Sequence, residues 1–281
     1  PILIFGVGPI PAMGLNGAAM AALLARASIF IGTLYLMRMR LDMVSFSKPD
    51  PVEMRESWRD ILHVGIPAAG TNAIVPIGAA VITAMIARYG ADAVAGFGVA
   101  SRIESMMLVM YYALSAIIGP FVGQNFSAGK EDRILRSLWL CSAFCIISGL
   151  VIAAFLAVAS GVLPGLFSDS DSVKSVTSTF LWIVPISYGT YGMVMVMNAS
   201  FNGLGHPMPA VYISVGRIVV LYVPLALVGM HFFDVAGIFA GYAIANIVSG
   251  IGAYIWARNT VRSRCAKGGS VEVQPVTETL T

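Results

Sequence analysis

The chain has 281 residues, of which 58% are hydrophobic and only 11% are charged, and its formal net charge is +3. A soluble domain carries about 25% charged residues, so this composition excludes a soluble globular protein whose core is covered by a charged surface. The apolar residues instead form stretches long enough to cross about 30 Å of hydrocarbon as helices. The sequence therefore predicts an all-α, polytopic membrane helical bundle.

The apolar stretches predict about seven transmembrane helices, which divide the chain into four parts. The part at 1–38 contains the first span, 39–63 is a polar connection, 64–262 contains the other six spans, and 263–281 is a polar tail that we expect to be disordered. In chain order the spans are expected at residues 15–38, 64–87, 93–123, 136–160, 176–201, 209–230 and 236–257.

The polar connection at 39–63 changes character along its length. Its second half sets Trp58 and Ile61 among Arg55, Arg59 and Asp60. Apolar and charged side chains mixed in this way are typical of an amphipathic helix that lies on a membrane surface. We therefore expect a surface helix just before the second span.

The distribution of cations predicts the orientation of the bundle, because cytoplasmic loops carry an excess of Lys and Arg. If the 39–63 connection is cytoplasmic, the outer loops hold only Arg88 and Lys174. Twelve cations then lie inside: Arg38, Arg40, Lys48, Arg55, Arg59, Lys130, Arg133, Arg136, Arg258, Arg262, Arg264 and Lys267. We expect a cytoplasmic C-terminus and a multi-pass location in the inner membrane.

Four short motifs follow one another along the chain. The most specific is GPFVGQNFSAGKEDR at 119–133, and the others are NASFNGLGHPMPA at 198–210, GIP at 65–67 and NGAA at 16–19. In these motifs and in their order the chain resembles the multidrug and toxic compound extrusion (MATE) family of cation-coupled exporters. The resemblance covers nearly the whole chain up to about residue 262, with Ser127 where a Gly is more usual.

The resemblance implies an architecture of two six-helix lobes. Residues 1–38 would end the N-terminal lobe, 39–63 would link the lobes, and 64–262 would form the complete C-terminal lobe, with the rest of the N-terminal lobe outside this sequence. It also implies a monomeric secondary transporter without a cofactor, an enzymatic activity or a nucleic-acid partner. Such a transporter would export organic, cationic compounds by antiport with Na⁺ or H⁺. The alternatives are a lipid-linked or polysaccharide flippase of the same superfamily and, less well supported, a membrane-embedded enzyme.

Polar side chains inside the spans are the candidates for a substrate or cation site, since lipid penalises them. In the third span Ser101, Glu104, Tyr111 and Ser115 fall within about 80° of one another at 100° per residue, and the other spans show similar stripes. We expect these stripes to face a water-filled cavity. The candidate cavity residues are Asn72, Ser101, Glu104, Tyr111, Tyr191, Asn198 and Asn246.

Glu104 is the only carboxylate well inside a span. A carboxyl buried in a membrane can take up and release a proton near neutral pH, which suggests a coupling role. The alternative is a structural pair with Arg26 or Arg217, which otherwise would anchor helix-end carbonyls. One branch of the family uses a Glu and an Asp in this lobe, and the corresponding positions here are Val75 and Tyr191, so the chain departs from that branch.

Glycine and proline predict the turns and hinges. Gly123, Gly129, Gly203 and Gly205 permit φ > 0, and Pro120 and Pro207 are expected to interrupt hydrogen bonding at helix ends. Gln124 and Asn125 would satisfy freed backbone groups. Pro76 and Pro185 are hinge candidates or static kinks. No spacing of His or Cys indicates a metal site.

Overall fold

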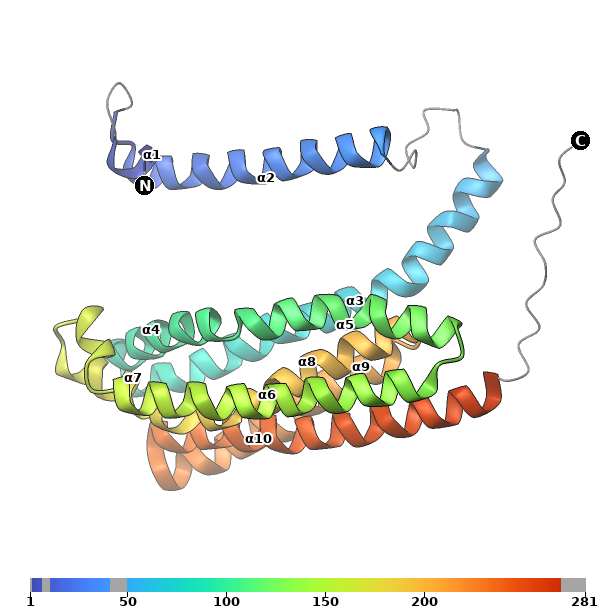
Figure 1. The fold of residues 1–281 in the computed structure, drawn as a ribbon. Helices are drawn as coiled ribbons and strands as arrows, with labels where there is room; N and C mark the ends of the chain where they lie inside the picture. The colour runs from blue at the N-terminus through green and yellow to red at the C-terminus, as the bar shows by residue number, and fades with distance from the viewer. Residues whose placement is uncertain (1, 7–10, 41–49, 269–281) are drawn as a thin grey trace, which may run out of the picture. The chain divides into compact units, whose positions relative to one another are not determined.

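The computed structural model describes residues 2–6, 11–40 and 50–268, and every regular element in these ranges is helical (Figure 1). This confirms the prediction of an all-α bundle. The chain divides into two compact units, Pro1–Arg59 and Asp60–Thr281, which are described separately.

The first unit contains α1 (Ile2–Phe5), α2 (Gly14–Met39) and the beginning of α3 (Pro51–Ile86). Helix α2 contains the predicted first span, and nearly all of its 26 residues are exposed. Helix α3 begins at a proline, as helices often do, and the Asp50 carboxylate accepts a hydrogen bond from the Val52 N–H at 3.0 Å. The second half of the predicted linker is therefore helical, and it continues without a break into the second span. Its position on a membrane surface stays a prediction, and residues 41–49 lie outside the described ranges.

The second unit contains the other predicted spans, and each of them falls on a helix or on a pair of helices in series. After α3 follow η1 (Ala87–Tyr89), α4 (Ala91–Met107), α5 (Val109–Ser127), α6 (Glu131–Ala159), η2 (Leu163–Leu166), α7 (Asp171–Ile183), η3 (Val184–Ser187), α8 (Tyr188–Gly203), α9 (Met208–Val215), η4 (Gly216–Tyr222) and α10 (Val223–Gly268). The last helix reaches Gly268, so the first residues of the predicted disordered tail are helical instead.

Four helical stretches of the described residues are long and apolar enough to cross a membrane, and five if the bent pair α4–α5 is one span. One stretch, Met208–Arg264, holds two helices, because Phe233 and Asp234 leave helical φ/ψ and reverse the chain between them. The pair α4–α5 is bent by 45° around Leu108. The chain is therefore a multi-pass membrane protein.

Helix α8 lies at the centre of the second unit, where it packs against α5, α6 and α10. In the most apolar stretch of α7, η3 and α8, 78% of the residues are buried, whereas in that of α6 only 22% are buried. Large apolar side chains cover the exposed face of α6, as expected where a helix contacts lipid: Trp139, Phe144, Ile147, Leu150, Val151, Phe155 and Val158. The interior of the unit is thus built around α8.

Small residues let the helices approach α8 closely. A Cβ added to Gly203 would collide with the backbone carbonyl of Gly119 on α5, and one added to Gly149 on α6 would collide with the backbone of Gly189 on α8. Such contacts between small residues are typical of helix packing in membranes. They correct one prediction: Gly123 and Gly203 have no positive φ, and they serve close helix packing instead of a turn.

The predicted turns at Gly129 and Gly205 do form, with φ values of +65° and +66°. Pro120 lies inside α5 and does not end it, because the helix continues to Ser127. The side-chain amide of Asn125 donates to the backbone carbonyl of Phe121 at 2.8 Å, while Gln124 is exposed. The 119–133 motif therefore closes α5 and packs it on α8.

The two proline hinge candidates differ in their surroundings. Pro185 lies in the short 3₁₀ segment η3, which separates α7 from α8. A 3₁₀ segment in the middle of a helical span often marks a hinge. Pro76 lies inside α3, which remains helical on both sides of it. Whether either position moves during transport stays a prediction.

Candidate functional site

A cavity of about 470 Å³ lies between α3, α4, the start of α5, α8, η4 and α10. This volume is within the range of pockets that bind small organic molecules, about 300–1,000 Å³. Aliphatic and small residues of α3, among them Gly78 and Ile82, form one side, and polar and aromatic residues of the other helices form the rest. The cavity is therefore an apolar pocket with a few polar groups, all within the second unit.

Glu104 on α4 is the carboxyl of this cavity, and Ser101 lines it one turn earlier on the same helix. The Tyr242 hydroxyl on α10 donates a hydrogen bond to Oε1 of Glu104 at 3.2 Å. Glu104 forms no ion pair within 4.0 Å in the described part of the chain. The expected structural pair with Arg217 is thus absent there, and Arg26 lies in the other unit.

Arg217 on η4 lines the same cavity and is 6% exposed. Its Nη1 donates to Oδ1 of Asn246 on α10 at 3.0 Å, and its guanidinium carbon lies 4.8 Å from the ring centre of Tyr191 on α8. Asn246 in turn donates from Nδ2 to Oγ of Ser187 at 3.1 Å. Arg217 was expected to bond helix-end carbonyls or Glu104, and its observed partner is instead a buried amide side chain.

Four tyrosines complete the polar wall: Tyr112, Tyr191, Tyr222 and Tyr242. The rings of Tyr222 on η4 and Tyr242 on α10 lie 4.8 Å apart between their centres and are tilted by 35°. Tyr191 lies beneath the Arg217 guanidinium. Aromatic faces of this kind attract both cations and flat rings. The wall can present aromatic faces, one carboxyl and one guanidinium to a ligand.

A π-helical segment places two of these residues together. In an α-helix, residues five apart differ by about 140° in direction, at 100° per residue. In the π-helix η4 (Gly216–Tyr222) each turn closes by i→i+5 bonding, so Arg217 and Tyr222 come to one face. Both line the cavity. π-Segments inside α-helices are frequent at functional sites.

The structure brings four of the predicted cavity residues to this site and places Asn198 and Tyr111 elsewhere. Ser101, Glu104 and Tyr191 line the cavity, and Asn246 accepts a hydrogen bond from Arg217, which also lines it. Asn198 packs away from the cavity, where its Nδ2 donates to Ser214 Oγ at 3.2 Å. The side chain of Asn72 lies outside the described residues.

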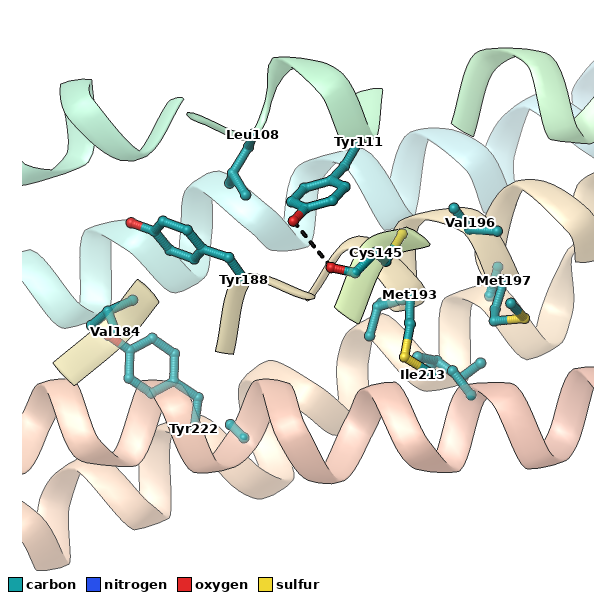
Figure 2. Packing of buried hydrophobic residues seen from close by; sticks show 14 of the residues in the cluster. Leu108, Tyr111, Cys145, Val184, Tyr188, Met193, Val196, Met197, Ile213 and Tyr222 are labelled. Carbon is teal, nitrogen blue, oxygen red and sulfur yellow. Dashed lines mark hydrogen bonds between the residues drawn. The ribbon is translucent and has the colours of Figure 1, made fainter. Parts of the chain in front are cut away.

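Tyr111 does not line the cavity. Its hydroxyl donates to the Cys145 carbonyl on α6 at 3.3 Å (Figure 2). The hydroxyl also lies 3.1 Å from Ser148 Oγ on the same helix, and the Tyr111 ring packs against Gly192. The bend at Leu108 separates it from Ser101 and Glu104, which remain on the cavity side. The single polar stripe predicted for this span is therefore split in two.

Arg217 and Tyr222 were absent from the predicted cavity set. Tyr242 belongs to the polar stripe of the last span, one turn from Asn246 on the same helix face, although it was not among the candidate cavity residues. Arg217 could have been included as a cation within a predicted span. Tyr222 could not, because its position depends on the π-segment.

The chain matches the MatE family model over residues 67–228. It is 34% identical to a FAD transporter of Shewanella oneidensis over 258 residues, which cover 92% of this chain and 57% of that protein. It is 25% identical to NorM, a probable multidrug resistance protein of Thermotoga maritima, over 83% of this chain and 50% of that protein.

Solved structures show the same fold. The crystal structure of the Vibrio cholerae MATE transporter VcmN in its bent form is 28% identical, with a TM-score of 0.79 over 94% of this chain and 59% of that one. The chain thus spans between half and three fifths of the length of these relatives. The relatives are transporters, which confirms the expectation that the chain is not an enzyme. The chain belongs to the MatE family of membrane transporters.

Proposed function

We propose that this chain is the C-terminal lobe, with the last helix of the N-terminal lobe, of a secondary transporter that exports small organic molecules. Inward H⁺ or Na⁺ drives the export. The observation that carries the proposal is Glu104, a carboxyl that lines a cavity of about 470 Å³ inside a membrane bundle and bonds a tyrosine instead of an arginine. Binding of a cation to such a carboxyl can shift which side of the membrane the cavity faces.

The charge distribution of the loops supports an orientation in the membrane. With the 39–63 connection and its Lys and Arg residues inside, the C-terminus is cytoplasmic and the transporter lies in the inner membrane. The transporter works as a monomer and needs no cofactor beyond its coupling ion. Between the two transport readings, the MatE match at 67–228 favours small-molecule export over lipid-linked or polysaccharide flipping.

Two substrate classes fit the cavity. Organic cations would use Glu104 and the tyrosine faces, in line with the relatives named as multidrug resistance proteins. A flavin nucleotide is the second candidate, because the 34% identical relative is a FAD transporter. The two classes differ in charge and make different demands on Arg217.

The test is transport by the full-length protein in a pump-deficient bacterium and in proteoliposomes. Ethidium, a fluoroquinolone and FAD serve as substrates, each with an H⁺ gradient, with a Na⁺ gradient and without either. We expect gradient-dependent export of at least one of them and loss of most of that export in Glu104→Gln. Transport of none under any gradient would overturn the proposal, and undiminished export by Glu104→Gln would remove Glu104 from coupling.

A further inference from the structure

The guanidinium of Arg217 is buried with few hydrogen-bond partners in the described part of the chain. Arginine stays protonated in proteins and has five N–H donors. In the part of the chain that the structure describes, Arg217 donates one hydrogen bond, to the neutral amide of Asn246, and its Nε has no partner. It forms no ion pair within 4.0 Å there. A buried charge in this state is destabilising until an acceptor completes it.

The surroundings hold the guanidinium in place instead of neutralising it. Asn246 binds one end, and the Asn246 amide is itself fixed by Ser187. The Tyr191 ring supports the guanidinium from one side at 4.8 Å. A guanidinium held in this way has a fixed plane, and its fork matches the two oxygens of a carboxylate or phosphate.

The aromatic part of the cavity lies next to this group. The π-segment places Tyr222 on the same face as Arg217, and the Tyr222 ring packs against Tyr242. Flat rings bind well to such faces. Arg217 repels an organic cation and attracts the acidic group of an aromatic anion, whereas Glu104 in the same cavity has the opposite effect while it is charged.

We propose that Arg217 is an anion-binding residue of the cavity and that the substrate is a flat aromatic molecule that carries a phosphate or carboxylate group. This inference rests on the proposed function, since it names the substrate class of the same cavity. It assigns the acidic group to Arg217 and the ring to the tyrosine wall. Glu104 remains available for N–H donors of the substrate.

A matched pair of probes isolates the acidic group. Riboflavin and flavin mononucleotide (FMN) share one ring system and differ by a phosphate. Their binding to the purified full-length protein is measured by flavin fluorescence at fixed salt, pH and temperature. Since a hydrogen bond to a charged group contributes about 1.5–3 kcal/mol, we expect FMN to bind at least about tenfold more tightly than riboflavin.

Variants at Arg217 link this preference to the residue. In Arg217→Gln we expect the FMN preference to fall to about twofold or less, with riboflavin affinity retained. Arg217→Lys keeps the charge and loses the planar fork, so it should retain an intermediate preference. Equal affinities in the wild-type protein would overturn the inference without any variant, and so would an unchanged preference in Arg217→Gln.

The binding assay separates this inference from the proposed function. An FMN preference that depends on Arg217 supports the anion site even if no gradient drives transport, and in that case only the transport proposal fails. Gradient-driven export of ethidium with equal binding of FMN and riboflavin gives the reverse result. It leaves a cation exporter and overturns the anion site.

Discussion

Tyr242 and Asn246 lie one helical turn apart on α10 and hold the two opposite charges of the cavity separately. Tyr242 donates to Glu104 and Asn246 accepts from Arg217. Residues four apart share one face of a helix, so a single helix positions the Glu104 carboxyl of α4 and the Arg217 guanidinium of η4. Because each charge has its own neutral partner, both remain available to a ligand or a coupling ion.

Removal of the Tyr242 hydroxyl should uncouple Glu104 from α10. We expect Tyr242→Phe and Glu104→Ala to be non-additive in thermal unfolding of the full-length protein, with a coupling energy of about 0.5–3 kcal/mol. Tyr222→Phe is the matched control, since that ring contacts Tyr242 and its hydroxyl makes no bond to Glu104. Additive effects of Tyr242→Phe and Glu104→Ala would show that the hydrogen bond does not hold Glu104.

The π-segment should tolerate the loss of one residue from its exposed side. Val220 is 65% exposed in η4, and its deletion allows α-helical i→i+4 bonding. Arg217 and the following tyrosine then stand four apart, about 40° from each other, so the cavity face is kept. We expect a folded protein that still binds flavin.

Deletion of Val228 is the control for this experiment. Val228 is also exposed but lies in the α-helical part of α10, so its loss rotates the flanking residues by about 100° relative to each other. We expect this variant to unfold at a lower temperature or to fail to accumulate. Equal loss of folded protein in both deletions would show that the π-segment cannot be exchanged for an α-helical turn.

The contact between α5 and α8 should not tolerate a methyl group. In Gly203→Ala the added carbon meets the backbone carbonyl of Gly119, and overpacking of this kind costs about 1–3 kcal/mol. Gly252→Ala on α10 is the matched control, since nothing lies within 4 Å of its added carbon. Alanine lowers the backbone entropy of the unfolded chain, so this substitution should be neutral or slightly stabilising. Thermal unfolding of the full-length protein measures both, and equal melting temperatures would contradict the packing argument.

The turn between α8 and α9 should loosen in acid. Partial burial, and then the neighbouring Arg264 guanidinium, lower the pKa of His206, and Arg264 also donates to the Leu204 carbonyl at 3.2 Å. The folded state therefore favours neutral His206, and its contribution to stability is full above the ordinary pKa of about 6.5 and declines as the pH falls below that value. After correction for intrinsic rates, hydrogen exchange near Arg264 should be faster at about pH 5.5 than at 7.5. His206→Gln should remove that difference, and a difference that persists in this variant would point to another group.

The sequence was sufficient for the positions of the helices because apolar length dominates in a membrane. It placed Glu104 correctly on the cavity side of its helix but not Tyr111, since the bend at Leu108 contains neither Pro nor Gly. Tertiary contacts of Tyr111 with Gly192 and α6 accompany that bend. The assignment of helix faces at 100° per residue assumes straight α-helices. The bend at Leu108 and the π-segment both depart from that geometry.

The two substrate classes make opposite predictions for the pH dependence of binding. When Glu104 takes up a proton, the cavity loses a negative charge, while Arg217 stays charged and Tyr191, Tyr222 and Tyr242 are neutral near pH 7. A cation such as ethidium then loses an attraction, so its affinity should fall as the pH is lowered. FMN loses a repulsion, so its affinity should rise.

The measurement uses the full-length protein between about pH 6.5 and 8.5, where the FMN phosphate keeps most of its charge because its second pKa is about 6. Glu104→Gln is the control and should flatten both dependences. A cation that competes with the proton at Glu104 fits antiport through this residue. An anion that binds together with the proton does not, and antiport of an anion would then need a different coupling acid. Parallel slopes for ethidium and FMN, or slopes that persist in Glu104→Gln, would show that Glu104 does not control the charge of the cavity.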